Sequence, residues 1–147
     1  MKIFRRRTIR SQRGQSMVEM AIMMVILMTI LSAVMDLGRG FFVFIAIQNS
    51  AAEGALYAAM YPKCESAANC ADPNNVTYRA QHESSDGLVD STKMTVTVSY
   101  SSLTEGSPVT VKIGYRFRMI GPFSGVLPNG ELLFEAHATQ NILDLKQ

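Results

Sequence analysis

Residues 13–35 read RGQSMVEMAIMMVILMTILSAVM, a short polar start followed by a long apolar run. From residue 20 to residue 35 no side chain is charged, and the only polar ones belong to Thr29 and Ser32, whose hydroxyls can hydrogen-bond to their own helix backbone. Extended to residues 17–37, the run has about twenty residues, enough for a helix to cross a hydrocarbon core of about 30 Å. We therefore predict one membrane-spanning helix; a buried helix in a soluble protein is the alternative.

The charges that flank this run predict its orientation. Six of the fourteen basic side chains lie in residues 1–14, and all twelve acidic side chains lie beyond them. By the positive-inside rule, residues 1–14 stay in the cytoplasm and the C-terminal part of the chain lies outside. Without these residues the chain carries eight basic and twelve acidic side chains, a net charge of −4 that gives no support to nucleic-acid binding.

A cleaved secretory signal peptide has the same basic start and is the main alternative to a retained helix. The apolar run is longer than that of a typical signal peptide. Met35-Asp36-Leu37, directly after it, is a poor cleavage site because it lacks the small residues such a site requires. We therefore predict that the helix stays in the mature protein.

Glu19 is an ionisable residue at the edge of the apolar run. A carboxylate there costs a few kcal/mol unless it is paired, which points to a functional role. Ser16 and Glu19 also fit the capping-box pattern, in which each side chain bonds to the backbone amide of the other. The residues alone leave both explanations open.

Gly14, with Glu19 five residues later, lies between a basic leader and an apolar helix. This arrangement resembles the processing site of type IV pilins and pseudopilins. A longer pattern has three parts: Arg13-Gly14-Gln15-Ser16-Met17-Val18-Glu19, Asp36-Leu37-Gly38-Arg39 and Asn49-Ser50-Ala51-Ala52-Glu53-Gly54-Ala55. This pattern is similar to the TadE-like pseudopilins of the tight-adherence (Tad) pilus system.

The resemblance implies specific chemistry at the start of the helix. A prepilin peptidase would cut between Gly14 and Gln15, and Glu19 would pair with the new amino terminus of an adjacent subunit. Gln15 replaces the aromatic first residue common in other pilins, and Met20 replaces the tyrosine of the small major pilins of Tad systems. These departures and the chain length indicate a minor subunit.

The resemblance also implies a function in pilus assembly and surface adherence. The expected partners are the prepilin peptidase, other pilins and pseudopilins of the same system, the inner-membrane assembly platform and the lipid bilayer. The expected location is the cytoplasmic membrane, and the pilus or cell surface after assembly. The alternative is an uncleaved single-pass membrane protein that presents an extracytoplasmic binding or adhesin domain.

The helical pattern continues beyond the span as far as Pro62. A helix over residues 16–61 would measure roughly 70 Å. Gly38 and Gly40 each weaken a helix by about 1 kcal/mol relative to alanine, so we expect any kink there. Apolar residues at three- and four-residue spacing predict the packed face, which would consist of Phe41, Phe42, Ile45, Ala52, Leu56 and Ala59.

The second half of this helix is rich in small residues, which suit close packing against the protein's own sheet or a neighbouring subunit's helix. They are Ala51, Ala52, Gly54, Ala55, Ala58 and Ala59. Asp36 and Arg39, three residues apart, are expected to pair across one helical turn at the outer membrane boundary. We interpret this pair as an interface anchor and not as a catalytic dyad.

Cys64 and Cys70 are the only cysteines in the chain. Outside the cytoplasm they predict a disulfide that closes a small ring and contributes about 2 to 3 kcal/mol. Metal binding is the alternative, but it needs further ligands, and the only histidines, His82 and His137, are isolated in the sequence.

Residues 62–147 predict an α+β head. Asp72-Pro73 suggests a helix start, after which Val76, Ala80, Leu88 and Val89 would face inward. Alternating apolar and polar residues predict a hairpin of strands over residues 94–100 and 109–117, and a third strand over residues 132–142. Such a sheet needs a cover, which the second half of the long helix supplies.

The predicted fold class is therefore α+β and pilin-like, with a long N-terminal helix packed on a small antiparallel sheet of about three strands. We expect no catalytic residues, cofactor or metal, because two histidines and scattered acids assemble no nucleophile with its base. The predicted domains are a cytoplasmic leader (1–14), a transmembrane helix (15–37), its extracytoplasmic continuation (38–61) and the head (62–147).

Overall fold

The computed structural model describes residues 13–83 and 89–143. Most of the predicted leader, and Leu88 of the predicted inward-facing set, lie outside these residues. The elements in chain order are helices α1 (Arg13–Met60) and α2 (Val76–His82), the short 3-10 helix η1 (Ser91–Lys93), strands β1 (Met94–Tyr100) and β2 (Pro108–Arg118), the 3-10 helices η2 (Pro122–Val126) and η3 (Pro128–Gly130), and strand β3 (Glu131–Asn141).

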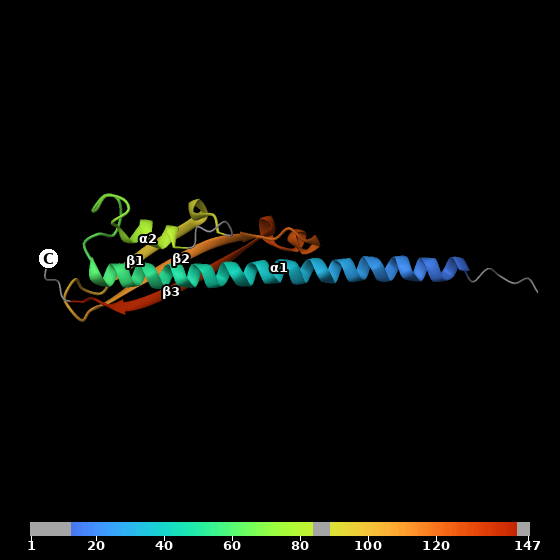
Figure 1. The fold of residues 1–147 in the computed structure, drawn as a ribbon, viewed down its shortest axis with the longest axis horizontal. Coiled ribbons are helices and arrows are strands. Elements are labelled where there is room, and N and C mark those ends of the chain that lie inside the picture. The colour runs from blue at the N-terminus through green and yellow to red at the C-terminus, as the bar shows by residue number, and fades with distance from the viewer. Residues whose placement is uncertain (1–12, 84–88, 144–147) are drawn as a thin grey trace, which may run out of the picture.

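The three strands form one antiparallel sheet in the order β1-β2-β3, and α1 lies along it (Figure 1). The predicted fold class, a long N-terminal helix packed on a three-stranded antiparallel sheet, is confirmed. Alternation fixes the face of the central strand, because successive side chains of a strand point to opposite sides. On β2 the side facing the core is buried and consists of Val109, Val111, Ile113, Tyr115 and Phe117.

The face of α1 that packs on the sheet differs from the predicted one. Of the predicted residues only Ala59 is buried; Phe41, Phe42, Ile45, Ala52 and Leu56 are exposed. The buried stripe runs instead through Gly40, Val43, Ile47, Ala51, Gly54 and Ala58. Because α1 is apolar on most sides, the spacing of its large side chains did not identify the packed face.

Small residues on this stripe let the head approach the helix closely. A Cβ atom on Gly54 would lie 3.0 Å from the Ala80 Cβ of α2 and 3.2 Å from the Val111 Cγ1 of β2. Ala51, Ala55 and Ala58 are fully buried around it. The small-residue segment therefore packs against the protein's own head, the first of the two predicted alternatives.

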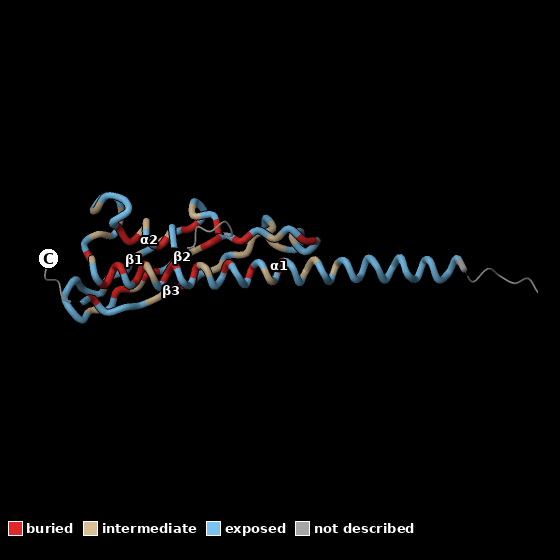
Figure 2. Tube along the Cα trace, in the orientation of Figure 1, coloured by how far each residue is buried: buried red, intermediate tan, exposed pale blue. Residues whose placement is uncertain are grey.

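The other half of α1 carries no such packing. In Figure 2 burial is confined to the part of α1 that lies beside the sheet and stops short of its N-terminal part. We call residues 14–35 the bare segment, because each of them is exposed except the half-buried Thr29, Ser32 and Ala33. Among the described residues, α1 is the one helix long and apolar enough to cross a membrane, and the head does not bury that stretch. It is therefore not the buried core helix of the soluble alternative.

Helix α2 starts later than predicted. It begins at Val76, and its N-cap is Asn75, whose side-chain oxygen accepts a hydrogen bond from the Tyr78 backbone N–H at 2.8 Å. The prediction of a start at Asp72-Pro73 was wrong because Asn75 caps the helix more directly. Val76 and Ala80 are buried, and Val89 is too, as expected.

Cys64 and Cys70 form the predicted disulfide. The Asn75 side-chain amide donates to the Cys70 carbonyl at 3.1 Å, and the Val76 N–H donates to the Cys64 carbonyl at 2.9 Å. The disulfide ring is therefore held against the start of α2.

Candidate functional site

The predicted processing residues lie in the first two turns of α1. Gly14 and Gln15 are exposed, and among the described residues no atom other than those of the adjoining helix backbone lies within 4 Å of the place a Cβ on Gly14 would take. The Gln15 Nε2 donates to the Glu19 Oε1 at 3.1 Å. Since α1 begins at Arg13, Ser16 lies inside the helix and is not its N-cap, so the capping-box explanation for Glu19 was wrong.

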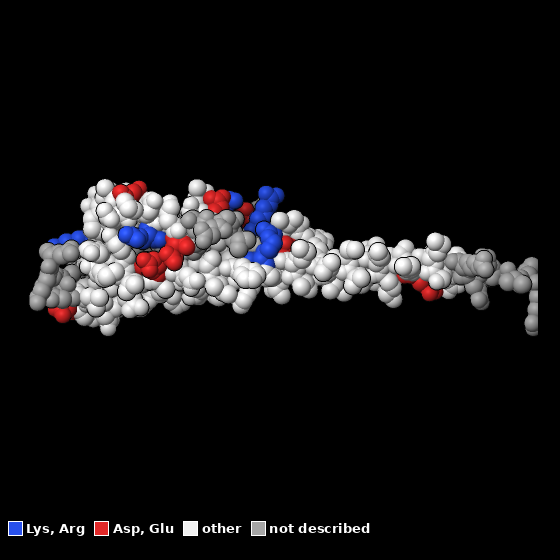
Figure 3. Space-filling model, in the orientation of Figure 1, with Lys and Arg blue, Asp and Glu red and all other residues white. Residues whose placement is uncertain are grey.

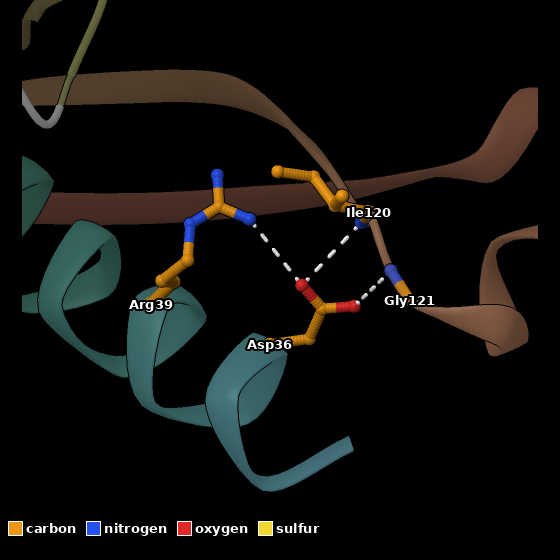
Figure 4. Close-up of polar contacts among 4 residues, drawn as sticks. All are labelled: Asp36, Arg39, Ile120 and Gly121. Carbon is orange, nitrogen blue, oxygen red and sulfur yellow. Dashed lines mark hydrogen bonds and ion pairs between the residues drawn. The ribbon is translucent and has the colours of Figure 1, made fainter. Parts of the chain in front are cut away.

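Asp36 lies where the bare segment ends and the head begins. Its side chain is only 5% exposed. The Oδ2 accepts a hydrogen bond from the Gly121 N–H at 2.6 Å, and the Oδ1 accepts from the Ile120 N–H at 3.4 Å and from the Arg39 Nη1 at 3.3 Å (Figure 4). One carboxylate thus binds both its helical neighbour and a loop more than eighty residues away.

Gly121 fits this site because it has no side chain. A Cβ there would lie 2.6 Å from the Asp36 Oδ2 and 2.8 Å from the Ser32 Oγ, closer than real Cβ contacts. The backbone of Gly121 is ordinary, with φ of −71°, so alanine would meet a steric obstacle and not a conformational one.

Arg39 continues the contact toward the sheet. Its guanidinium carbon lies 5.4 Å from the centre of the Phe117 ring, and Phe117 stacks on Phe134 at 5.5 Å. A Cβ on Gly40 would lie 3.5 Å from Phe134 and 3.6 Å from Phe117, so β2 and β3 rest directly on the helix at this glycine.

These contacts explain why α1 has no kink. The loop after β2 is bonded to Asp36, two residues before Gly38 and four before Gly40, while β2 and β3 pack on α1 from Gly40 onward. The head therefore braces the helix on both sides of its weakest point. α1 passes through both glycines as one helix (Figure 1), so the expectation of a kink was wrong.

Residues 14–56 match the family described as TadE-like protein. The match is confined to helix α1 and covers less than half of the chain. The matched segment begins at Gly14 and contains Gln15, Glu19, Asp36 and Arg39, whereas the whole head (62–147) lies outside it. No curated protein and no solved structure matches the chain.

The TadE-like family is a family of membrane-anchored proteins that are associated with Tad pili. It is not an enzyme family. Within residues 13–83 and 89–143, no three His, Cys, Asp or Glu side chains gather to hold a metal ion.

The sequence predicts the contact of Asp36 with Arg39 but not its contacts with Ile120 and Gly121. The spacing of Asp36 and Arg39 predicts their contact, and the structure places the two side chains 3.3 Å apart. Ile120 and Gly121 gave no comparable signal, because they are remote in sequence and contribute only backbone amides. The one available hint was Gly121-Pro122 in a loop without charged residues.

Proposed function

We propose that this TadE-like chain is a minor pilin, or pseudopilin, of a Tad (Flp-type) pilus that acts in pilus assembly and surface adherence. The observation that carries the proposal is the position of Gly14, Gln15 and Glu19 at the start of a helix whose following apolar turns are bare. An exposed glycine without neighbours is accessible to a peptidase, and a bare apolar helix needs lipid or other helices around it.

In this proposal residues 15–37 span the cytoplasmic membrane, with the leader inside and the head outside. The basic leader supports this orientation through the positive-inside rule. The Cys64–Cys70 disulfide supports it as well, because disulfides persist in oxidising compartments and are rare in the cytoplasm.

Cleavage after Gly14 creates a new amino group on Gln15, four residues before Glu19. When the bare segments of several subunits pack together, the Glu19 carboxylate of one subunit pairs with this amino group on its neighbour. The apolar surroundings strengthen that charge pair because their dielectric constant is low. A misplaced subunit leaves the carboxylate unpaired in an apolar environment, and this cost selects the correct register.

The cleavage is tested by the intact mass of the protein extracted from piliated cells. We expect a mass that corresponds to residues 15–147 for the native chain and to the full chain for Gly14→Leu. Gly38→Leu is the matched control, since Gly38 also has no atom within 4 Å of its Cβ position and should not affect cleavage. Native protein that keeps residues 1–14 in normally piliated cells would favour the uncleaved, adhesin-presenting anchor.

The role of Glu19 is tested by Glu19→Ala. We expect normal membrane insertion and cleavage but loss of the protein from sheared pili, or loss of pili, since the new amino group lacks its partner. Thr29→Ala is the control, because the Thr29 hydroxyl bonds to the Val25 carbonyl of its own helix at 2.8 Å. Unchanged piliation and incorporation in Glu19→Ala would refute the charge pair.

A further inference from the structure

The connection between β2 and β3 exposes large apolar side chains. We call residues 119–130 the β2–β3 loop; it contains no Asp, Glu, Lys or Arg. Ile120 is 75% exposed, Val126 79% and Phe123 43%. Adjacent exposed apolar residues on one loop commonly mark a contact with a partner or a membrane.

The loop lies beside the bare segment and not above it. From Gly121, which is bonded to Asp36, the chain turns toward the N-terminal end of α1 (Figure 1). Pro122 borders a shallow surface groove whose other walls are Met24, Val25, Met28, Thr29 and Ser32. Met28 precedes Asp36 by eight residues, or about 12 Å along the helix axis. If the span ends at residue 37, part of the loop lies at the depth of the hydrocarbon region.

Lipid tails offer no hydrogen bonds, so a backbone at such a depth needs partners within the protein, and part of the loop's backbone has them. Pro122 and Pro128 have no N–H to satisfy. Asp36 accepts hydrogen bonds from Ile120 and Gly121, and three further amides bond within the loop: Met119 N–H to Gly130 O at 3.1 Å, Ser124 N–H to Gly121 O at 3.0 Å, and Gly130 N–H to Leu127 O at 3.1 Å. Asp36 thus pairs two of the loop's backbone donors.

Basic residues mark the level directly above the loop. Arg116 and Arg118 are exposed at the end of β2, and the Arg39 side chain is partly exposed beside them. Figure 3 shows a group of basic side chains where the head meets the bare part of the helix. A basic layer above an apolar loop matches the order of a bilayer, with phosphate headgroups above acyl chains.

We propose that the β2–β3 loop inserts into the outer leaflet of the membrane, as a second contact of the head with lipid beside the spanning helix. This inference rests on the proposed span of residues 15–37. The occupant of the apolar surface of Ile120, Phe123 and Val126 is lipid, because the loop adjoins the bare segment: Pro122 lines one groove with Met28, and Phe123 lines another with Ala33.

Single tryptophans test the insertion, since the chain has none of its own. The full chain with Phe123→Trp is reconstituted into phosphatidylcholine and phosphatidylglycerol vesicles that contain brominated lipid, with bromine near the headgroup or near the chain end. We expect a blue-shifted emission and loss of most of the fluorescence with the shallow quencher. Val126→Trp is a second reporter, should Phe123→Trp disturb the fold.

Two controls separate this inference from the proposed span. The Leu103→Trp variant, changed at a half-exposed position between β1 and β2 at the other end of the sheet, should not be quenched, whereas Met28→Trp should be. If Met28→Trp is quenched but both loop variants behave like Leu103→Trp, the loop inference is wrong and the span stands. If Met28→Trp is not quenched, both the loop inference and the proposed span are wrong. Blue-shifted but unquenched emission from Phe123→Trp would mean that protein covers the loop, which also overturns the inference.

Discussion

The shortest link between the helix and the head is the contact of the Gly121 amide with the Asp36 carboxylate, at 2.6 Å. The contact requires that Gly121 has no side chain and that the charged carboxylate of Asp36 is buried beside it. The contact of Asp36 with Arg39 was predictable, because residues three apart on a helix are neighbours. The partners from the loop were not, since any residue except proline has a backbone N–H and no sequence pattern shows which one a carboxylate will bind.

Gly121→Ala should weaken this link. The added methyl group overlaps the Asp36 Oδ2 and the Ser32 Oγ, and overpacking of this kind costs about 1–3 kcal/mol. We expect faster hydrogen exchange at the Ile120 amide of the detergent-solubilised chain. Gly125→Ala, in the same loop but with no atom within 4 Å of its Cβ position, should leave the exchange rate unchanged. Equal rates in the two variants would contradict the steric role of Gly121.

At the scale of elements, the strands were easier to predict than the face of the helix. Strand alternation reveals the buried side directly, because one face of this sheet packs on α1 and the other is polar. On α1 the same reasoning fails. Phe41 and Phe42 are each 61% exposed, whereas the packed side combines Val43 and Ile47 with glycine and alanine, so neither hydrophobicity nor the spacing of large side chains distinguishes it.

Gly54→Leu tests that distinction. The leucine side chain would enter a space already filled by Ala80 of α2 and Val111 of β2, at a cost of about 3 kcal/mol or more. We expect a lower urea midpoint for the head, measured through the near-ultraviolet circular dichroism of the tyrosines. Ala52→Leu, two residues away on the exposed side of α1, should change the midpoint little. A similar loss in both variants would mean that the two faces of α1 are equally packed.

At the scale of the whole molecule, the charges at the N-terminus and the redox state of the cysteines in the head both relate to the direction in which the chain would cross the membrane. The leader holds six of the fourteen basic residues, and the disulfide lies at the far end of α1 beside α2. If the leader fixes the orientation, the redox state of the cysteines reports which side of the membrane the head occupies.

Replacing Arg5, Arg6 and Arg7 with glutamate should therefore leave the head in the cytoplasm with reduced cysteines. Alkylation of whole cells lysed without reductant would then modify Cys64 and Cys70 in this variant but not in the native protein. The lysine replacements at the same positions keep the charge and should keep the disulfide. Protected cysteines in the glutamate variant would show that the leader charges do not set the orientation.

The continuity of α1 also has a mechanical consequence. The helix is not interrupted between the bare segment and the head, and the Asp36 contact stiffens the glycine pair. From Leu37 to Met60 the axis extends roughly 35 Å, so a tilt of about 20° from the bilayer normal displaces the distal end sideways by about 12 Å. If residues 15–37 span the membrane as proposed, a change in the tilt of α1 within the lipid moves the disulfide-bearing end of the head sideways.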